Sequence, residues 1–396
     1  MSGVDEHAAD RRDKEDDVPS ASSRLQDDAR SSSDPTVILS GRKAVVHIAE
    51  SFAGGVSVAI QDYMRNTPER SHHLIFAQRS DAPISGSELQ DFATVTPLPL
   101  GFLARIRTIR RVVSSLPDVI VHAHSSFGGA YTRLALRAKS SCPIVYTPHC
   151  YAFERRDIST LWRVAYRAVE FALSFNTSAY AACSRREETL SKWPLGRRKA
   201  VFVPNVPPRH LVPRSAFAPE DSERSLRVVG AGRFGAQKAP EFFAAAVADL
   251  RAAGHDLDAL WIGGGRDDRI QGLLDQAGVR VTGWLPRESA LEILVTADLY
   301  LHVARWEGFP VAVLESVALG VPTIVRAIPA FDDVALPVKV DDPTDLRLRW
   351  SELIDPAVRN RLVQESRQVL ADYSDSGQAR ALRRIYDGVP ASKKGQ

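Results

Sequence analysis

Two glutamates eight positions apart, Glu307 and Glu315, stand in a context that suits the binding of hydroxyl groups. The apolar run 298–303 predicts a buried strand, and the run 311–319 predicts the helix that follows it. One carboxylate is therefore expected on the loop after a strand and the other on a helix. Carboxylates accept charge-assisted hydrogen bonds from hydroxyls, which a sugar nucleotide carries on both its sugar and its ribose. The turn 308–309 also brings backbone N–H groups to the helix start, where ligand oxygens bind well.

The segment 228–240 upstream runs from a predicted strand, 226–231, into a glycine-rich loop that carries one arginine and one lysine. Glycines such as Gly232 let the backbone approach a diphosphate closely, while Arg233 offers a planar fork and Lys238 a point charge. The loop is not a Walker loop, which needs Gly-Lys-Ser/Thr at the helix start. Each feature alone is ordinary, since helix dipoles favour glutamate near N-termini. The cationic and acidic pairs together predict one ligand with a diphosphate and hydroxyls.

Together these motifs resemble those of retaining glycosyltransferases of the GT-B fold, in family 4. The resemblance covers about residues 43–390 and is strongest over 226–326. It implies that Arg233 and Lys238 contact the donor diphosphate. It implies that Glu307 and the backbone of Gly308 and Phe309 contact the transferred sugar. Glu315 is then expected at the ribose.

The resemblance extends to two further segments of the same half. Residues 261–265 resemble the family's glycine loop after its second strand, so Gly263 and Gly265 are expected beside the donor. Residues 281–286, with Trp284, resemble the segment that lies near the base.

His149 follows the predicted strand 144–147, and ligands of open parallel sheets bind at the carboxyl ends of strands. The resemblance implies that His149 reaches toward the donor sugar, and a capped histidine on a loop is the alternative. Two departures from the family pattern are present. Ala239 stands where a glycine often follows the lysine, and 326–334 lacks the Gly-Gly-x-x-Glu commonly seen there.

The turn at Gly54 and Gly55 joins a predicted strand, 44–49, to a predicted helix, 56–64. It is not Gly-x-Gly-x-x-Gly, and no acidic residue stands where a dinucleotide ribose would need one, which argues against a nicotinamide cofactor. The resemblance places this turn opposite the acceptor or the donor phosphate. A simple tight turn is the other interpretation.

Two motifs raise the question of a metal. His122 and His124 end a predicted strand and point to one side of it, but no third ligand is evident, and a role in lining the cleft is preferred. Asp256 and Asp258 precede a strand, whereas carboxylates that hold a metal over a diphosphate must follow one. We expect no metal and no cofactor, because the basic pair supplies the positive charge.

Alternating strand and helix patterns predict an α/β protein with two Rossmann-like doubly wound domains that face a cleft. The expected parts are a disordered polar tail (1–40), an acceptor-side domain (41–206), a linker (207–225), a nucleotide-sugar-binding domain (226–375), and a crossover helix with a tail (376–396).

Composition limits the class and the partners. The chain has 396 residues and 44% apolar content, enough for two domains. Its three cysteines form no Cys-x-x-Cys pair, and it has neither a secretory signal nor an apolar membrane span, so a cytoplasmic location is expected. Residues 41–206 carry 22 basic and 12 acidic side chains, against 5 and 10 in 1–40. This basic half suits an anionic membrane or acceptor, unless its arginines only maintain solubility.

The predicted helix 102–116 has an apolar face and several arginines. Packing on the sheet is favoured over membrane contact, which stays as a second possibility.

These patterns lead to one expected activity. A sugar moves from a nucleotide-diphosphate sugar, with a UDP-sugar favoured and GDP-mannose next, to a glycan or lipid-linked acceptor with retention of configuration, in polysaccharide or envelope glycan synthesis. The residues expected to act in catalysis are His149, Arg233, Lys238 and Glu307. The alternatives are a nucleotide-sugar epimerase of the same fold and a non-catalytic sugar-nucleotide-binding protein. No nucleic-acid partner is expected.

Overall fold

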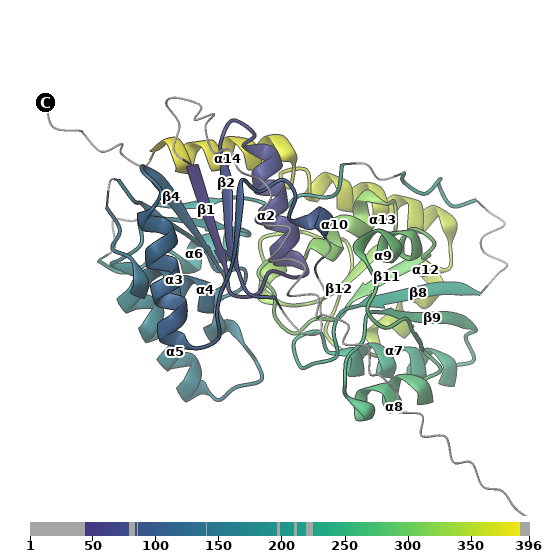
Figure 1. Cartoon of the computed structure of the whole chain (residues 1–396). Helices are drawn as coiled ribbons and strands as arrows, with labels where there is room; N and C mark the ends of the chain where they lie inside the picture. The colour runs from purple at the N-terminus through teal and green to yellow at the C-terminus, as the bar shows by residue number, and fades with distance from the viewer. Residues whose placement is uncertain are drawn as a thin grey trace, which may run out of the picture. The chain divides into compact units, whose positions relative to one another are not determined.

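The computed structural model describes residues 44–78, 84, 86–139, 141–195, 199–209, 212–218 and 225–388 (Figure 1). The polar segment 1–40 and part of the expected linker lie outside these residues. The described part contains two parallel β-sheets with helices packed on them, which confirms the predicted α/β class and its two doubly wound units.

The first sheet has seven parallel strands in the order β3-β2-β1-β4-β5-β6-β7. Its strands are β1 (Ala44–Ala49), β2 (His72–Phe76), β3 (Thr94–Pro97), β4 (Val119–His124), β5 (Ile144–Thr147), β6 (Ala179–Ala182) and β7 (Lys199–Phe202). The apolar runs of the sequence predict all of these except β3. This edge strand is partly exposed and ends in proline, so it has no buried apolar run to reveal it.

The second sheet has six parallel strands in the order β10-β9-β8-β11-β12-β13. They are β8 (Leu226–Ala231), β9 (Leu257–Ile262), β10 (Arg280–Val281), β11 (Leu299–His302), β12 (Thr323–Arg326) and β13 (Lys339–Val340). The strand order reverses between β8 and β11. The loops that follow these two strands therefore meet at the carboxyl edge of the sheet, which is where ligands bind in folds of this class.

Three of the helices illustrate the local signals at which helices begin. Pro240 is the first residue of its helix, Asp267 accepts a hydrogen bond from the Ile270 N–H, and Ser184 accepts one from the Glu187 N–H. The helices are α2 (Gly55–Asn66), α3 (Phe102–Ser114), α4 (Ser126–Ala135), α5 (Thr160–Ser174), α6 (Arg185–Leu190), α7 (Pro240–Ala252), α8 (Asp268–Gln276), α9 (Arg287–Leu294), α10 (Val311–Ala318), α11 (Asp345–Leu348), α12 (Trp350–Leu353), α13 (Pro356–Val369) and α14 (Asp375–Gly388).

The core of the second unit lies on both faces of its sheet, because successive strand residues point to opposite sides. Val228 packs with Phe243 of α7 and Leu274 of α8 on one face. Its neighbour Val229 packs with Val313 and other residues of α10 on the other face. This burial of both faces explains why the strands are nearly continuous apolar runs.

The last helix, α14, packs on elements of the first sheet. Leu382, Ile385 and Tyr386 are buried in one cluster with Val45 of β1 and Tyr63 of α2. This arrangement agrees with the crossover helix expected from the resemblance, and the domain limits themselves stay a prediction.

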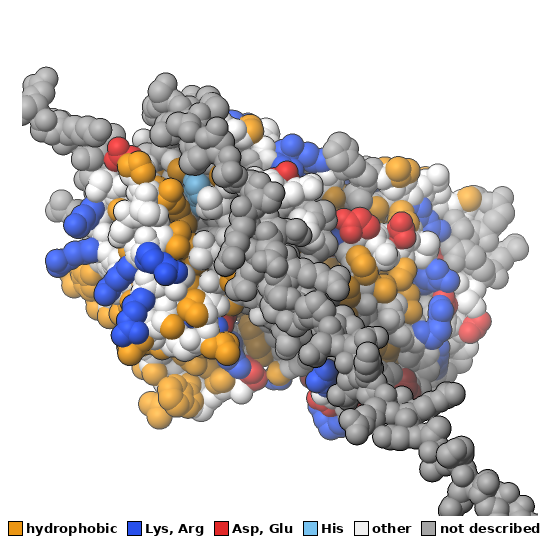
Figure 2. Space-filling model, in the orientation of Figure 1, with side chains coloured by type: hydrophobic (Ala, Val, Ile, Leu, Met, Phe, Trp, Pro, Cys, Tyr) orange, Lys and Arg blue, Asp and Glu red, His pale blue; other side chains and the backbone are white. Residues whose placement is uncertain are grey.

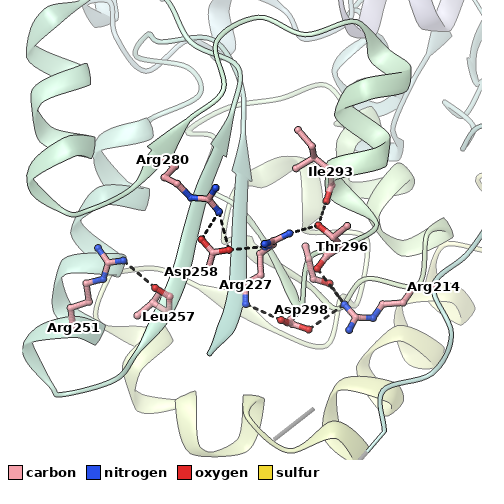
Figure 3. A network of polar contacts seen from close by, with 10 residues as sticks. Arg214, Arg227, Arg251, Leu257, Asp258, Arg280, Ile293, Thr296 and Asp298 are labelled. Atoms are coloured by element: carbon pink, nitrogen blue, oxygen red, sulfur yellow. Dashed lines mark hydrogen bonds and ion pairs between the residues drawn. The ribbon is translucent and has the colours of Figure 1, made fainter. Parts of the chain in front are cut away.

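A network of charges occupies the amino ends of the strands in the second sheet (Figure 3). Arg227 of β8 donates to Asp258 of β9 over 2.8 Å, and Arg280 donates to the same carboxylate over 2.7 Å. Arg214, from the expected linker, lies 3.2 Å from the fully buried carboxylate of Asp298. Asp258 was expected just before a strand and is instead the second residue of β9, where two arginines bind it at the edge away from the loops after β8 and β11.

Candidate functional site

A cavity of about 420 Å³ lies between the carboxyl edges of the two sheets. From the first sheet it is lined by the residues after β4 and β5, and from the second by the loop after β8 and by Trp306. Three of the predicted site residues, His149, Arg233 and Lys238, line it together. The full lining comprises Ser125, Ser126, Phe127, Pro148, His149, Cys150, Tyr151, Ala152, Arg155, Asp157, Arg233, Phe234, Gly235, Ala236, Gln237, Lys238 and Trp306.

The predicted meeting of the basic and acidic residues is present at Lys238. Its Nζ lies 2.6 Å from Oε1 of Glu307, and the Lys238 and Glu307 side chains are 27% and 11% exposed. Gln237 is not singled out by the sequence analysis. Its side-chain amide donates to the Trp306 carbonyl over 3.1 Å, and its backbone carbonyl accepts from the Arg305 N–H. These bonds join the loop after β8 to the loop after β11.

Glu315 lies on α10 and has a separate partner. Nε of Arg287, at the start of α9, donates to Oε1 of Glu315 over 2.8 Å. Burial raises the pKa of Tyr300, and the nearby carboxylates of Glu315 and Glu307 raise it further. Both glutamates thus lie around one buried tyrosine, although each pairs with a different cation. Arg287 was missed because nothing in its own segment links it to α10.

The glycines of the second unit pack two loops together. A Cβ atom on Gly232 would lie 2.7 Å from the side chain of Lys238, and one on Gly265 would lie 2.9 Å from Phe234. A Cβ atom on Gly263 would collide with the carbonyl of Gly232. Only glycine at these positions lets the loops after β8 and β9 approach so closely, and this packing positions the loop that carries Lys238.

Two other predicted features take different positions. Trp284 is 52% exposed and is not among the residues that line the cavity. Ala239 has a left-handed backbone with φ 48°, which explains why glycine is usual at this position, and the alanine carries a strain of about 1 kcal/mol.

The turn at His149 has an unusual backbone. His149 and Cys150 have φ values of 49° and 85°, and Ser125, which follows the neighbouring strand β4, has 62°. The buried carboxylate of Glu187 holds this turn, because it accepts hydrogen bonds from the Cys150 and Cys183 N–H groups, each over 2.8 Å. Backbone strain that neighbouring groups maintain in this way is typical of functional sites.

Glu187 was not singled out, although a sequence signal existed. Ser184 and Glu187 form the Ser-x-x-Glu pattern of a capping box. Here the serine caps α6, while the glutamate turns back to the strand end and to the His149 loop. Burial raises the pKa of this carboxyl group.

Gly308 and Phe309 belong to the same contact region. A Cβ atom on Gly308 would lie 2.7 Å from the Cys150 nitrogen, so glycine allows the loop after β11 to pack on the His149 turn. The Phe309 ring is buried and lies 4.1 Å from the ring of Tyr373. Its carbonyl accepts a hydrogen bond from Asn205 over 2.8 Å.

The turn at Gly54 and Gly55 begins α2 with a left-handed glycine, φ 56° at Gly54. A Cβ atom on Gly55 would lie 3.7 Å from Val311, the first residue of α10. The turn therefore adjoins the helix that carries Glu315, and its phosphate role stays a prediction.

The histidines require two corrections. The sequence showed no third partner for His122 and His124, but the structure brings His47 to them, with ligand nitrogens of all three within 4.8 Å. His124 has no exposed surface, so it does not line the cleft as expected; instead its Nδ1 lies 3.0 Å from Nε2 of His149. Burial lowers the pKa of His47, His122 and His124 well below the usual value, so all three are neutral.

Comparison with protein families identifies both halves of the chain. Residues 225–355 match the model described as "Glycosyl transferases group 1", and residues 53–206 match the model "Glycosyltransferase Family 4". The two matched ranges together contain all of the predicted site residues.

Two curated relatives cover much of the chain. An uncharacterized 41.2 kDa protein in the cps region of Klebsiella pneumoniae is 25% identical over 306 residues, which is 73% of this chain and 82% of that protein. The UDP-Gal:α-D-GlcNAc-diphosphoundecaprenol α-1,3-galactosyltransferase of Escherichia coli is 26% identical over 231 residues, 53% of this chain and 58% of that enzyme.

Among solved structures, the sucrose-phosphate synthase of Thermosynechococcus elongatus superposes with a TM-score of 0.70. The match has 18% identity and covers 88% of this chain and 99% of that one. It supports the two-unit GT-B fold.

Proposed function

Because this chain belongs to the group 1 glycosyltransferases of the GT-B fold, we propose that it moves a sugar from a nucleotide-diphosphate sugar to a lipid-linked or glycan acceptor. A UDP-sugar is the first choice of donor and GDP-mannose the second, and the configuration of the sugar is retained. The observation that carries the proposal is the cavity lined by His149, Arg233 and Lys238, with Lys238 in turn paired to Glu307.

Arg233 and Lys238 bind and stabilise the diphosphate as it leaves. Transfer breaks a bond between sugar and phosphate, so negative charge grows on the leaving oxygen, and fixed cations lower the barrier most when they stand in a partly dry site. Both residues line the cavity, and they follow the central strand β8. They supply the charge that a divalent ion supplies in other transferases, so the activity is independent of metal.

Glu307 orients the transferred sugar and Glu315 the ribose. In the free protein each carboxylate is held by a cation, Lys238 and Arg287 respectively, which keeps it in place to accept hydroxyl hydrogen bonds. A glutamate already paired with lysine suits binding better than nucleophilic attack. Retention then follows from attack by the acceptor on the face from which the diphosphate leaves.

The acceptor enters from the first unit. The galactosyltransferase relative bears the name of a UDP-sugar donor and a diphosphoundecaprenol acceptor, which supports a UDP-sugar and a lipid-linked acceptor here as well. The proposed setting is polysaccharide or envelope glycan synthesis.

A lipid-linked acceptor requires contact with a membrane surface, and we propose that α3 and α5 make it. Ile106, Ile109 and Val113 of α3 are buried, so this face packs on the sheet as expected, but Phe102 and Leu103 at its start are exposed. The α5 side chains Leu161, Trp162 and Val164 are 77%, 58% and 60% exposed. Figure 2 shows Lys and Arg side chains over the region of α3 and apolar side chains below them near α5. Apolar side chains beside arginines suit an anionic interface. Among the described residues, no helix combines the length and the apolar character of a membrane span.

Donor binding is tested first by thermal unfolding with UDP, GDP, ADP and their sugars. A ligand that binds only the folded state raises the melting temperature. We expect the largest shift with UDP or a UDP-sugar in the wild type and its loss in Lys238→Ala. No shift with any nucleotide, or equal shifts in the variant, contradicts the proposal.

Transfer is then tested with the best donor and undecaprenyl-diphosphate-linked sugars in anionic vesicles. Labelled sugar is expected in the lipid fraction, and the anomeric configuration of the product reports retention. Formation of an epimer from the donor alone would favour an epimerase.

Transfer without added metal and in the presence of EDTA is expected. Binding to vesicles of phosphatidylglycerol, but not of phosphatidylcholine, is expected to weaken in Trp162→Ser.

A further inference from the structure

Four histidines cross the first sheet in a continuous line of hydrogen bonds. Adjacent rings in this line approach to 3.0 Å between nitrogens at all three steps. In order they are His72 of β2, His47 of β1, His124 of β4 and His149 after β5.

The parallel register produces this line. His72 lies opposite Val45, which is two residues before His47, and His47 lies opposite His122, two residues before His124. His124 in turn lies opposite Thr147, two residues before His149. Residues two apart point to the same face of a strand, so the histidines climb diagonally on one face toward the carboxyl edge. The last ring belongs to a residue that lines the cavity.

The far end of the line determines where the first hydrogen lies. Nε2 of His72 is 3.2 Å from both the carbonyl oxygen and the hydroxyl oxygen of Thr67. A carbonyl can only accept, and the Thr67 hydroxyl donates its own hydrogen to the Tyr63 carbonyl over 2.6 Å. Both oxygens are therefore acceptors, and Nε2 of His72 carries the hydrogen.

Because each neutral ring carries one hydrogen, the hydrogen on His72 determines which nitrogen donates and which accepts in every later ring of the line. Burial lowers the pKa of His72 and of His149 to about 4, and the two rings between them are neutral for the same reason. A neutral imidazole has one donor and one acceptor. Nδ1 of His72 must accept from Nε2 of His47, and the same direction repeats through His124. His149 consequently donates from Nε2 and keeps a lone pair on Nδ1.

We propose that this histidine line holds His149 as a hydrogen-bond acceptor toward the cavity, with His72, His47 and His124 as positioning residues. Given the proposed function, Nδ1 of His149 receives a hydrogen bond from a hydroxyl of the bound sugar. The line ends at a backbone carbonyl, which cannot take up a proton, so its role is to select a tautomer rather than to conduct protons.

A metal bound by His47, His122 and His124 is the competing arrangement. The nitrogens of His122 lie 2.8 Å from the Tyr386 hydroxyl and 2.8 Å from the Thr147 hydroxyl, while those of His47 face other imidazoles. Each nitrogen thus has a hydrogen-bonding partner, which favours the hydrogen-bonded line.

The test is the tautomer of His149 in the full-length protein without donor. Two-bond ¹H–¹⁵N spectra of protein labelled at histidine distinguish Nε2–H from Nδ1–H rings, and a His149→Gln variant assigns the signal. The Nε2–H form is expected. A His149 ring in the Nδ1–H form, or in an even mixture, overturns the proposal, as does stoichiometric zinc in the purified protein.

Variants at the far end show whether the line transmits this choice. His72→Phe removes the first ring, and the Nδ1–H population of His149 is expected to rise about tenfold, the effect of one lost hydrogen bond. His72→Asn keeps an acceptor at the Nδ1 position and is expected to restore the wild-type tautomer.

His73→Phe is the matched control, since His73 is the next residue on β2 but contacts Thr94 instead of the line. Equal tautomer populations in His72→Phe and His73→Phe contradict the proposal. If His72→Phe does not fold, the spectra of the wild type and of His72→Asn still show whether His149 is in the expected Nε2–H form. Because these spectra need no donor, failure here is distinct from failure of the transferase assay.

Discussion

The two ends of the second sheet use the same types of charged residue in opposite ways. At the amino ends, Arg227, Arg280 and Arg214 bind Asp258 and Asp298 in a network of ion pairs and hydrogen bonds (Figure 3). At the carboxyl ends, the Lys238–Glu307 pair stands at the edge of a cavity.

The difference teaches that charge content alone does not identify a site. Asp256 and Asp258 resemble a metal-binding pair by their spacing, but Asp258 is bound by Arg227 and Arg280, and Asp256 accepts a hydrogen bond from the Ser225 hydroxyl. The glycines after β8 and β9 let the two loops at the other end pack closely together. We therefore expect substitutions at the carboxyl ends to change activity and substitutions at the amino ends to change stability.

The largest effect is expected from Lys238→Ala. Loss of a fixed cation at the leaving diphosphate should lower kcat/KM about 100-fold, while stability changes by less than about 1 kcal/mol because the ion pair is partly exposed. Arg280→Ala is the control at the opposite end, where the side chain is 64% exposed. Steady-state rates and urea unfolding measure both. A similar rate loss in the two variants would remove the distinction between the ends.

Asp298→Asn tests the closed end. Asp298 is fully buried, accepts from the Arg227 N–H over 2.8 Å and pairs with Arg214. Loss of the charge should lower the free energy of unfolding by about 2 kcal/mol and leave kcat within about twofold of wild type. Urea unfolding and donor turnover give the two readings. A large fall in kcat with unchanged stability would contradict this assignment.

Glu187→Gln extends the comparison to the first sheet, where a buried carboxylate supports the cavity rather than a closed network. The glutamine side chain would turn its own N–H toward either the Cys150 or the Cys183 N–H, so one hydrogen bond is lost. We therefore expect the free energy of unfolding to fall by about 2 kcal/mol. Movement of the His149 turn should also lower kcat/KM about tenfold. Glu188→Gln, one position on and paired with Arg185 near the surface, should change both quantities little. Unfolding curves and rates at a saturating donor concentration separate the two effects.

The last expected effect is on stability alone, and it depends on pH. The pKa of His72 is lowered to about 4 in the folded chain because the side chain is buried, against an ordinary value of 6.5. Between these values the unfolded state binds the proton and the folded state does not, so stability is complete above pH 6.5 and falls as pH drops toward 4.

Between pH 7 and pH 5 we expect His72→Asn to lose about 2 kcal/mol less than wild type. Urea unfolding at several pH values measures this difference. Parallel curves for the two proteins would show that His72 titrates normally.

Much of the architecture was readable from local patterns. The strands 144–147 and 226–231 are continuous apolar runs, and their predicted bounds match β5 and β8. β3 and β13 were not predicted because short or exposed edge strands bury too little apolar surface to leave a pattern. Arg287 and Asn205 were not identified as site partners, because each acts across a distance in sequence that no local motif records.

By itself the sequence determined the α/β class, the strand-to-loop positions of Arg233, Lys238, Glu307 and His149, and the family, because these depend on local periodicity and on short motifs. Only the tertiary structure decided that Lys238 pairs with Glu307, that Glu187 holds the His149 turn, and that His72, His47 and His124 stand behind it. These contacts depend on the order and register of parallel strands, which bring together residues from separate segments, and no single segment contains that information.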